Sequence, residues 1–251
     1  LREPILTAKE AASIDHLSGG RFVLGLAGGD RPSEYPAFGK EFDNRAERFQ
    51  ENWQVIRRLT EQSFPRFGTE HGGSFFGNLD LVPKPVQGRL PMMTVGRARQ
   101  DLRWIANESD GWLWYSADLP RLRSLMAELE RLNESGIWRP FGTCNFVELL
   151  EDASAPLQVF NSIYLRGGRK AIADFYAQQQ EIGVSHIIAN SAPHRRKAPA
   201  KTVFHSQKTP PPRGFLLSQA KEKPYASAYG FYDHPASRGA SVVKAFLNCA
   251  A

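Results

Sequence analysis

Cysteine is scarce in this chain of 251 residues, and long apolar runs are lacking. Cys144 and Cys249 lie far apart and have no C-x-x-C partner, which argues against a disulfide framework and against a thiolate zinc site. No stretch approaches 18 consecutive apolar residues, and the first twenty residues lack a charged start followed by an apolar segment. Neither a membrane span nor a secretory signal is therefore predicted, and we expect a cytoplasmic protein.

Charge is distributed unevenly along the chain. The net charge is +6, but residues 194–251 hold ten Lys or Arg and two Asp or Glu, so this last fifth carries +8 and residues 1–193 carry −2. The tail is also rich in proline. We therefore expect a near-neutral globular domain over 1–193 and a basic, Pro-rich tail over 194–251 that is irregular or disordered.

Apolar patterning predicts strands that alternate with helices. The expected strands cover residues 21–27, 90–96, 110–115, 146–150 and 184–190. The expected helices cover residues 1–17, 44–61, 100–108, 120–135 and 170–182. This alternation predicts an α/β fold with about five parallel strands. Residues 63–91 are interrupted by prolines and glycines, and we expect an excursion there that contains a small hairpin and is a candidate for a substrate lid.

Two glycine-containing segments come directly after predicted strands and are the candidate binding loops. Gly28, Gly29 and Asp30 come after the first strand, where backbone without Cβ atoms can approach a planar ring and Asp30 can accept from a ring N–H. The alternative is a structural turn in which Asp30 caps the next turn of the chain. Gly96–Arg99 (Gly, Arg, Ala, Arg) lies between a strand and a helix, where backbone N–H groups and two guanidinium groups can converge on a phosphate. The alternative is that Arg97 and Arg99 point outward into solvent.

Other polar residues form no catalytic set. His16 ends a helix and His186 lies within a strand, and neither has a second ligand at telling spacing. Glu148, Glu151 and Asp152 cluster at the end of a strand, which a solvated acidic rim explains as well as an acid/base pair does. No catalytic residue and no metal site is assigned from the sequence.

Several blocks of the sequence, taken together, resemble the bacterial luciferase-like flavin-dependent oxidoreductases. The blocks are Leu17–Gly25 (LSGGRFVLG), Glu34–Gly39 (EYPAFG), Arg45–Phe49 (RAERF), Leu90–Gly96 (LPMMTVG), Trp104–Ala106 (WIA), Ser109–Trp112 (SDGW) and Gly183–Ile187 (GVSHI). Their order and spacing make the likeness more specific than any single block. Within the group, the Gly-Asp-Arg-Pro segment at 29–32 looks closest to a luciferase-type oxidoreductase subfamily.

The resemblance implies a TIM-barrel-like (β/α)8 fold that binds a flavin at the carboxyl ends of its strands. It implies reduced FMN as the cofactor, or a deazaflavin in some branches, with a flavin reductase as donor. It also implies molecular oxygen and a small organic molecule as substrates, and a homodimer. Gly28, Gly29, Asp30, Gly96, Arg97, Ala98 and Arg99 are the residues that would contact the cofactor.

The likeness begins after the family's third strand, so we expect an incomplete barrel with two unpaired sheet edges and an exposed apolar inner face. In this subfamily, small hydroxyl and amide residues are common where Arg97 and Arg99 stand here. Three functions are compatible with these observations. The first is a flavin-dependent monooxygenase, and the second is a flavin-binding remnant without turnover. The third, which the tail's lack of regular patterning disfavours, is a nucleic-acid binder that uses residues 194–251.

Overall fold

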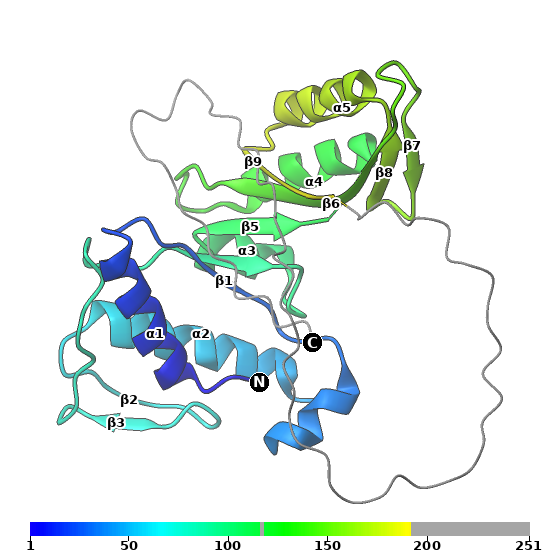
Figure 1. Ribbon diagram of the computed structural model, residues 1–251. Coiled ribbons are helices and arrows are strands. Elements are labelled where there is room, and N and C mark those ends of the chain that lie inside the picture. The colour runs from blue at the N-terminus through cyan, green and yellow to red at the C-terminus, as the bar shows by residue number, and fades with distance from the viewer. Residues whose placement is uncertain (116–117, 192–251) are drawn as a thin grey trace, which may run out of the picture.

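In a computed structural model of the chain, the structure describes residues 1–115 and 118–191, and these form a predominantly parallel sheet with helices packed against it (Figure 1). The sheet contains β1 (Leu24–Leu26), β4 (Met92–Val95), β5 (Gly111–Trp114), β6 (Phe141–Leu149), β7 (Gln158–Phe160), β8 (Tyr164–Gly167) and β9 (His186–Ser191). The strand order is β1-β4-β5-β6-β8-β7, and β9 also pairs with β6.

The five strands expected from the sequence are present, and each is parallel to its neighbours. β1 pairs with β4, β4 with β5, β5 with β6, and β6 with β9. Because successive strands lie side by side with a helix in each connection, the chain has the βα repeat that the alternation predicts. Within the described residues β1 pairs only with β4 and β9 only with β6, so the two ends of the predicted five-strand sheet are open, and β7, which pairs only with β8, adds a third edge.

The second half of the sheet differs from the expectation. The fourth predicted strand begins at Phe141 instead of Phe146, because the mixed sequence Phe-Gly-Thr-Cys-Asn carries no clear strand period yet pairs with both β5 and β9. β7 and β8 are not predicted by the sequence pattern. β8 is parallel to β6. β7, which precedes β8, is antiparallel to it, and the turn that joins them contains Asn161 and Ser162 with positive φ angles of 50° and 55°.

The five predicted helices are also present, with boundaries shifted by a few residues. They are α1 (Pro4–Leu17), α2 (Arg45–Glu61), α3 (Leu102–Glu108), α4 (Leu119–Leu132) and α5 (Arg169–Ile182). A short 3-10 helix, η1 (Pro32–Phe38), comes after β1 and is not expected from the sequence. The expected hairpin within 63–91 is confirmed as β2 (Arg66–Gly68) paired antiparallel with β3 (Ser74–Phe76).

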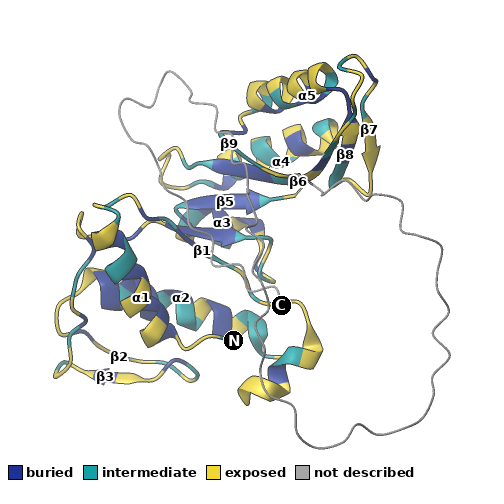
Figure 2. Ribbon diagram, viewed as in Figure 1, coloured by how far each residue is buried: buried dark blue, intermediate teal, exposed yellow. Residues whose placement is uncertain are grey.

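The strands of the sheet and parts of the helices packed on them are buried (Figure 2), and their apolar side chains form three clusters. Leu24 and Met92 pack with α1 and α2 around Trp53, which is 1% exposed. Trp112 and Phe141 pack with α3 and α4 in a second cluster. A third, smaller cluster lies where α5 covers β6 and β8. On the opposite face of β6, Phe146 is 39% exposed, in agreement with an inner face that is partly open.

No helix among the described residues combines the length and the apolar character needed to cross a membrane. The predicted basic tail over 194–251 lies outside the described residues.

Candidate functional site

The two candidate loops lie next to each other at the carboxyl ends of β1 and β4. These strands are hydrogen-bonded neighbours, with Leu26 opposite Thr94 in the parallel register. A Cβ atom added to Gly28 would lie 3.3 Å from the Cα of Ala98, so the two loops touch through backbone at this point. The sequence predicts this adjacency, because the carboxyl ends of neighbouring parallel strands lie at the same edge of a sheet.

The first loop is a tight turn that only glycine accommodates easily. Gly29 has a φ of +78°, and a Cβ atom there would lie 3.0 Å from the hydroxyl oxygen of Tyr35. That hydroxyl donates to the carbonyl oxygen of Gly28 at 2.7 Å and also lies 3.2 Å from the carbonyl oxygen of Gly29. The turn is therefore attached to η1 by a side chain that is 1% exposed.

Tyr35 is a neutral hydroxyl in a partly cationic setting. Burial raises its pKa, and the nearby charges of Arg48 and Arg45 only partly oppose that effect. The guanidinium carbon of Arg48 lies 5.5 Å from the centroid of the Tyr35 ring, and the Phe42 ring packs edge-on at 5.0 Å. The hydroxyl consequently keeps its proton at neutral pH and serves as a donor to the turn.

Asp30 is exposed at the end of this turn. The adjoining 3-10 helix has Arg31 at its N-cap position and no side-chain cap, so the capping role considered for Asp30 is not observed. Contact between Asp30 and a bound ring stays a prediction.

The second loop, Gly96–Arg99, is held in an unusual backbone conformation. Gly96, Ala98 and Arg99 have positive φ angles of 65°, 47° and 64°. For residues with a Cβ atom this left-handed region costs about 1–2 kcal/mol each, and such strain tends to be stored at functional sites. Among the described residues, the N–H groups of Arg97, Ala98 and Arg99 have no hydrogen-bond partner. They are free to donate to a ligand.

Two side chains donate hydrogen bonds to backbone carbonyl oxygens of this loop. The indole N–H of Trp112 donates to the carbonyl oxygen of Gly96 at 2.6 Å. The amide of Gln100, which is 5% exposed, donates to the carbonyl oxygens of Ala98 at 3.0 Å and of Ala46 at 3.1 Å. The loop is thereby attached both to β5 and to the start of α2.

Arg97 and Arg99 are both exposed at this loop. The guanidinium carbon of Arg97 lies 5.9 Å from the centroid of the Trp114 ring. Neither arginine has a carboxylate partner within the part of the chain that the structure describes. Two uncompensated cations and three free N–H groups in four residues give this loop the donor set that a phosphate accepts.

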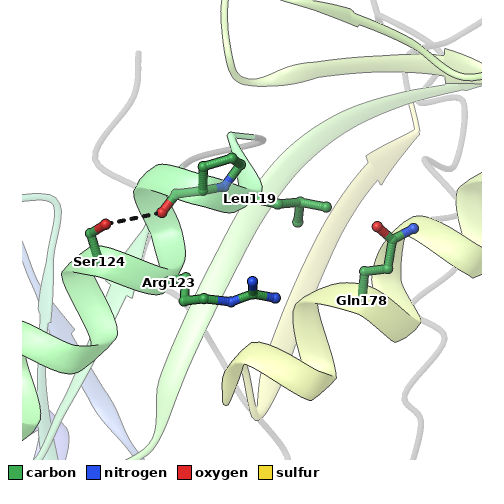
Figure 3. Close-up of a pocket in the computed structure, with 5 residues that line it drawn as sticks. Leu119, Arg123, Ser124 and Gln178 are labelled. Carbon is green, nitrogen blue, oxygen red and sulfur yellow. Dashed lines mark hydrogen bonds between the residues drawn. The ribbon is translucent and has the colours of Figure 1, made fainter.

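Two other features lie away from these loops. A groove of about 410 Å³ lies between α4 and α5 and is lined by Leu119, Pro120, Arg123, Ser124 and Gln178. Figure 3 shows Arg123 extending across it toward the helix that bears Gln178. None of the predicted site residues is among the residues that line it. Separately, Glu51, Glu70 and His71 bring donor atoms within 4.8 Å of one another beside the β2–β3 hairpin. Glu51 already accepts from the backbone N–H of His71 at 2.7 Å and Glu70 is exposed, so we assign no metal there.

Sequence reasoning identifies the two loops but misses the side chains that hold them. Tyr35 lies within the block Glu34–Gly39 that contributes to the family resemblance, but the prolines around it indicate only a loop. The sequence pattern makes Gln100 the first residue of a helix and Trp112 a packing residue. The sequence signal for such supporting side chains is a residue that can donate a side-chain hydrogen bond near a glycine turn, because a buried donor of this kind needs an acceptor.

Comparison with known proteins places these loops in a family context. Residues 1–141, more than half of the chain, match the family model described as luciferase-like monooxygenase. An uncharacterized protein of Mycobacterium tuberculosis (strain ATCC 25618 / H37Rv) is 33% identical over 143 residues, which cover 56% of this chain and 48% of the relative. An FMNH(2)-dependent dimethylsulfone monooxygenase of Pseudomonas putida is 30% identical over 114 residues, covering 43% of this chain and 30% of the relative. The chain thus spans about half or less of the length of these curated relatives.

Solved structures show the same fold at low sequence identity. The coenzyme F420-dependent tetrahydromethanopterin reductase of Methanopyrus kandleri superposes with a TM-score of 0.61 and 13% identity, covering 76% of this chain and 74% of that structure. The EDTA monooxygenase of Chelativorans sp. BNC1 gives a TM-score of 0.59 and 15% identity over 76% of this chain and 66% of its own. These likenesses confirm the α/β fold and the expectation of a partial (β/α)8 barrel. By its match to the family model, the chain belongs to the luciferase-like monooxygenase family.

Proposed function

We propose that this protein is a flavin-dependent oxidoreductase of the monooxygenase type, which uses reduced flavin and molecular oxygen on a small organic substrate. Family membership supports the reaction class. The observation that carries the proposal is the contact between Gly28 and the backbone of Ala98, which joins a glycine turn and a strained cationic loop at one edge of the sheet. Enzymes with a (β/α)8 barrel have their active sites at the carboxyl ends of the strands.

The residues at this edge fit the two halves of a flavin. Gly28 and Gly29 offer backbone without side chains, and Asp30 offers an exposed carboxylate, so we assign them to the planar ring. Arg97, Ala98 and Arg99 offer N–H groups without a partner among the described residues, and both arginines offer unpaired guanidinium groups, so we assign Gly96, Arg97, Ala98 and Arg99 to the phosphate. We also propose the domain boundaries expected from the distribution of charge and proline, with the barrel domain over 1–193 and the tail over 194–251.

The bound cofactor would supply electron transfer to oxygen, and the chain's own residues would bind, orient and shield it. Relatives of this chain are named for FMNH(2) and solved structures of the same fold for F420, so FMN is proposed first and a deazaflavin second. We further propose a separate flavin reductase as the source of reduced cofactor, a homodimeric assembly and a cytoplasmic location.

The test is reconstitution of the full chain with FMN. Binding is monitored by the change in the visible absorbance bands on titration, and turnover by the rate at which chemically reduced FMN is reoxidised with and without protein. A saturable spectral change and a reoxidation rate above the spontaneous rate support the proposal. Binding without a rate gain selects the second candidate, a flavin-binding protein without turnover. Absence of binding to both FMN and deazaflavin contradicts the assignment of the two loops.

A further inference from the structure

The hydroxyl of Tyr35 makes two polar contacts with the glycine turn that packing alone does not require. One buried O–H group lies 2.7 Å from the carbonyl oxygen of Gly28 and 3.2 Å from that of Gly29. A phenyl ring in the same position would keep the edge-on contact with Phe42 but would lose both polar contacts. The hydroxyl therefore acts on the backbone of two successive peptide units.

The direction of these carbonyl groups determines the direction of the neighbouring N–H groups. The peptide bonds that join Gly28, Gly29 and Asp30 are trans, and in a trans peptide the C=O and the next residue's N–H point in opposite directions. Since both carbonyl groups face the Tyr35 hydroxyl, the N–H groups of Gly29 and Asp30 point away from it. Among the described residues neither N–H has a hydrogen-bond partner, and both residues lie at the surface.

We propose that Tyr35 is a positioning residue whose hydroxyl fixes the Gly28–Gly29 turn and so presents the N–H groups of Gly29 and Asp30 to acceptor atoms on the edge of a bound planar ring. This inference rests on the proposed flavin site and specifies how that site recognises the ring. The ligand class is an aromatic heterocycle with carbonyl or imine acceptors along one edge, which the isoalloxazine ring provides. Tyr35 itself does not touch the ring.

Glycine at position 29 is also required for the contact between the Tyr35 hydroxyl and the turn. Its φ of +78° lies in the region that favours glycine, and a Cβ atom would lie 3.0 Å from the Tyr35 hydroxyl oxygen. A side chain at this position would therefore displace either the hydroxyl or the turn. Gly28 also lies against the backbone of Ala98, so this turn is in contact with the second loop.

The experiment compares the native chain with Tyr35→Phe by FMN titration and by the amide NMR signals of Gly29 and Asp30 in ¹⁵N-labelled protein. In the native chain, FMN is expected to move both amide proton signals downfield, as a new hydrogen bond does. In Y35F we expect the Kd for FMN to rise about tenfold and the downfield shifts to shrink, because the donors are no longer held in place. Tyr176→Phe is the matched control, since the Tyr176 hydroxyl is buried without a partner on α5 among the described residues, and its Kd should equal that of the native chain.

A second variant keeps the test decisive if Y35F folds poorly. Gly29→Ala in the native background is expected to raise the Kd for FMN and to weaken the downfield shift of the Asp30 amide, because its Cβ atom would displace the Tyr35 hydroxyl from the turn. An unchanged Kd and an unchanged Asp30 shift in G29A would overturn this inference. Equal Kd values and equal amide shifts in the native chain and Y35F would overturn this inference and leave the proposed function standing. A native chain that binds no flavin of either kind would overturn both.

Discussion

In the part of the chain that the structure describes, charged side chains are paired at one end of the parallel sheet and unpaired at the other. At the carboxyl ends of β1 and β4, Arg97 and Arg99 have no carboxylate partner among the described residues. At the amino ends of β4 and β5, four charged side chains from α2 and from the segments that precede the two strands form one connected network. The paired end is suited to stabilising the fold, and the unpaired end is the one that we propose for binding, a division that is general in (β/α) folds.

Asp110 is the centre of the charged network. Its carboxylate accepts from Arg57 at 2.5 Å, from Arg89 at 2.6 Å and from the backbone N–H of Met92 at 2.9 Å. Glu61 completes the network by pairing with both arginines. Burial acts to raise the pKa of Asp110, but the hydrogen bond from Arg89, the charge of Arg57 and the Met92 N–H together lower it. The C-terminal turn of α2 is thereby attached to the start of two strands.

The largest expected effect is on stability at the paired end. Asp110→Asn removes the charge that Arg57 and Arg89 share, and Arg57, whose side chain is 11% exposed, is left with Glu61 as its remaining ion-pair partner. We expect the free energy of unfolding to fall by about 2–3 kcal/mol, which is typical when one member of a partly buried network is removed. Urea unfolding monitored by circular dichroism measures the change.

Asp174→Asn is the matched control, because Asp174 is exposed on α5 and its carboxylate has no ion pair within the described residues. Its effect should stay within about 0.5 kcal/mol. FMN affinity of folded D110N should be unchanged. A tenfold loss of affinity in D110N would show that the two ends are not independent, and would break the comparison.

The next effect is on binding at the unpaired end. Replacing Arg97 and Arg99 together by Gln removes two cations and leaves the loop's backbone in place. We expect the Kd for FMN to rise about 30-fold, or about 2 kcal/mol, and the free energy of unfolding to change by less than about 0.5 kcal/mol. Isothermal titration at two salt concentrations measures the first quantity, and the native Kd should depend more steeply on salt than that of the variant.

A control for net charge is the pair Arg121→Gln and Arg123→Gln on α4, both exposed and outside the two loops. If this pair weakens FMN binding as much as the loop pair does, the effect is one of overall charge, and the assignment of Arg97 and Arg99 to a phosphate is wrong.

The order of elements in the fold could be predicted from the sequence, and the charged network could not. Strand and helix periods are local, so the five parallel strands and their helices can be identified from short windows. Asp110 in sequence is only an acidic residue before a glycine, because its partners Arg57 and Arg89 lie 53 and 21 residues away. β7 and β8 are missed for a similar reason, since their short, mixed sequences become strands by pairing with β6 and with each other.

The candidate site was predictable to the same extent. Parallel strands with glycine turns at their carboxyl ends predict which loops meet, and the contact of Gly28 with Ala98 confirms the adjacency. The role of Tyr35 depends on the path of η1 back beneath the turn, and no local period encodes that path. Backbone strain at Ala98 and Arg99 is likewise invisible in sequence, because neither residue type favours a positive φ angle.

A smaller effect sharpens the comparison through pH. Because the pKa of Asp110 is lower in the folded chain than in the unfolded one, its contribution to stability is complete above the unfolded value of about 4. It is lost as pH falls through the folded-state pKa, since the unfolded chain then binds the proton more tightly. The difference in urea midpoint between the native chain and D110N should therefore narrow below about pH 4. A difference that stays constant down to full acid unfolding would mean that the charge of Asp110 is not what stabilises this end.

The smallest expected effect concerns strain at the unpaired end. Ala98 has a φ of +47°, a conformation that glycine adopts with less cost, so Ala98→Gly relieves strain but adds freedom to the unfolded chain. We expect a net gain of about 0.5 kcal/mol in unfolding free energy and, because the free N–H groups are less firmly held, a Kd for FMN about threefold higher. Opposite signs for stability and affinity at one residue are what distinguish a strained binding loop from an ordinary turn. If Ala98→Gly lowers both, the positive φ at this position is merely a packing result, and the carboxyl end of the sheet is no more specialised for binding than the paired end.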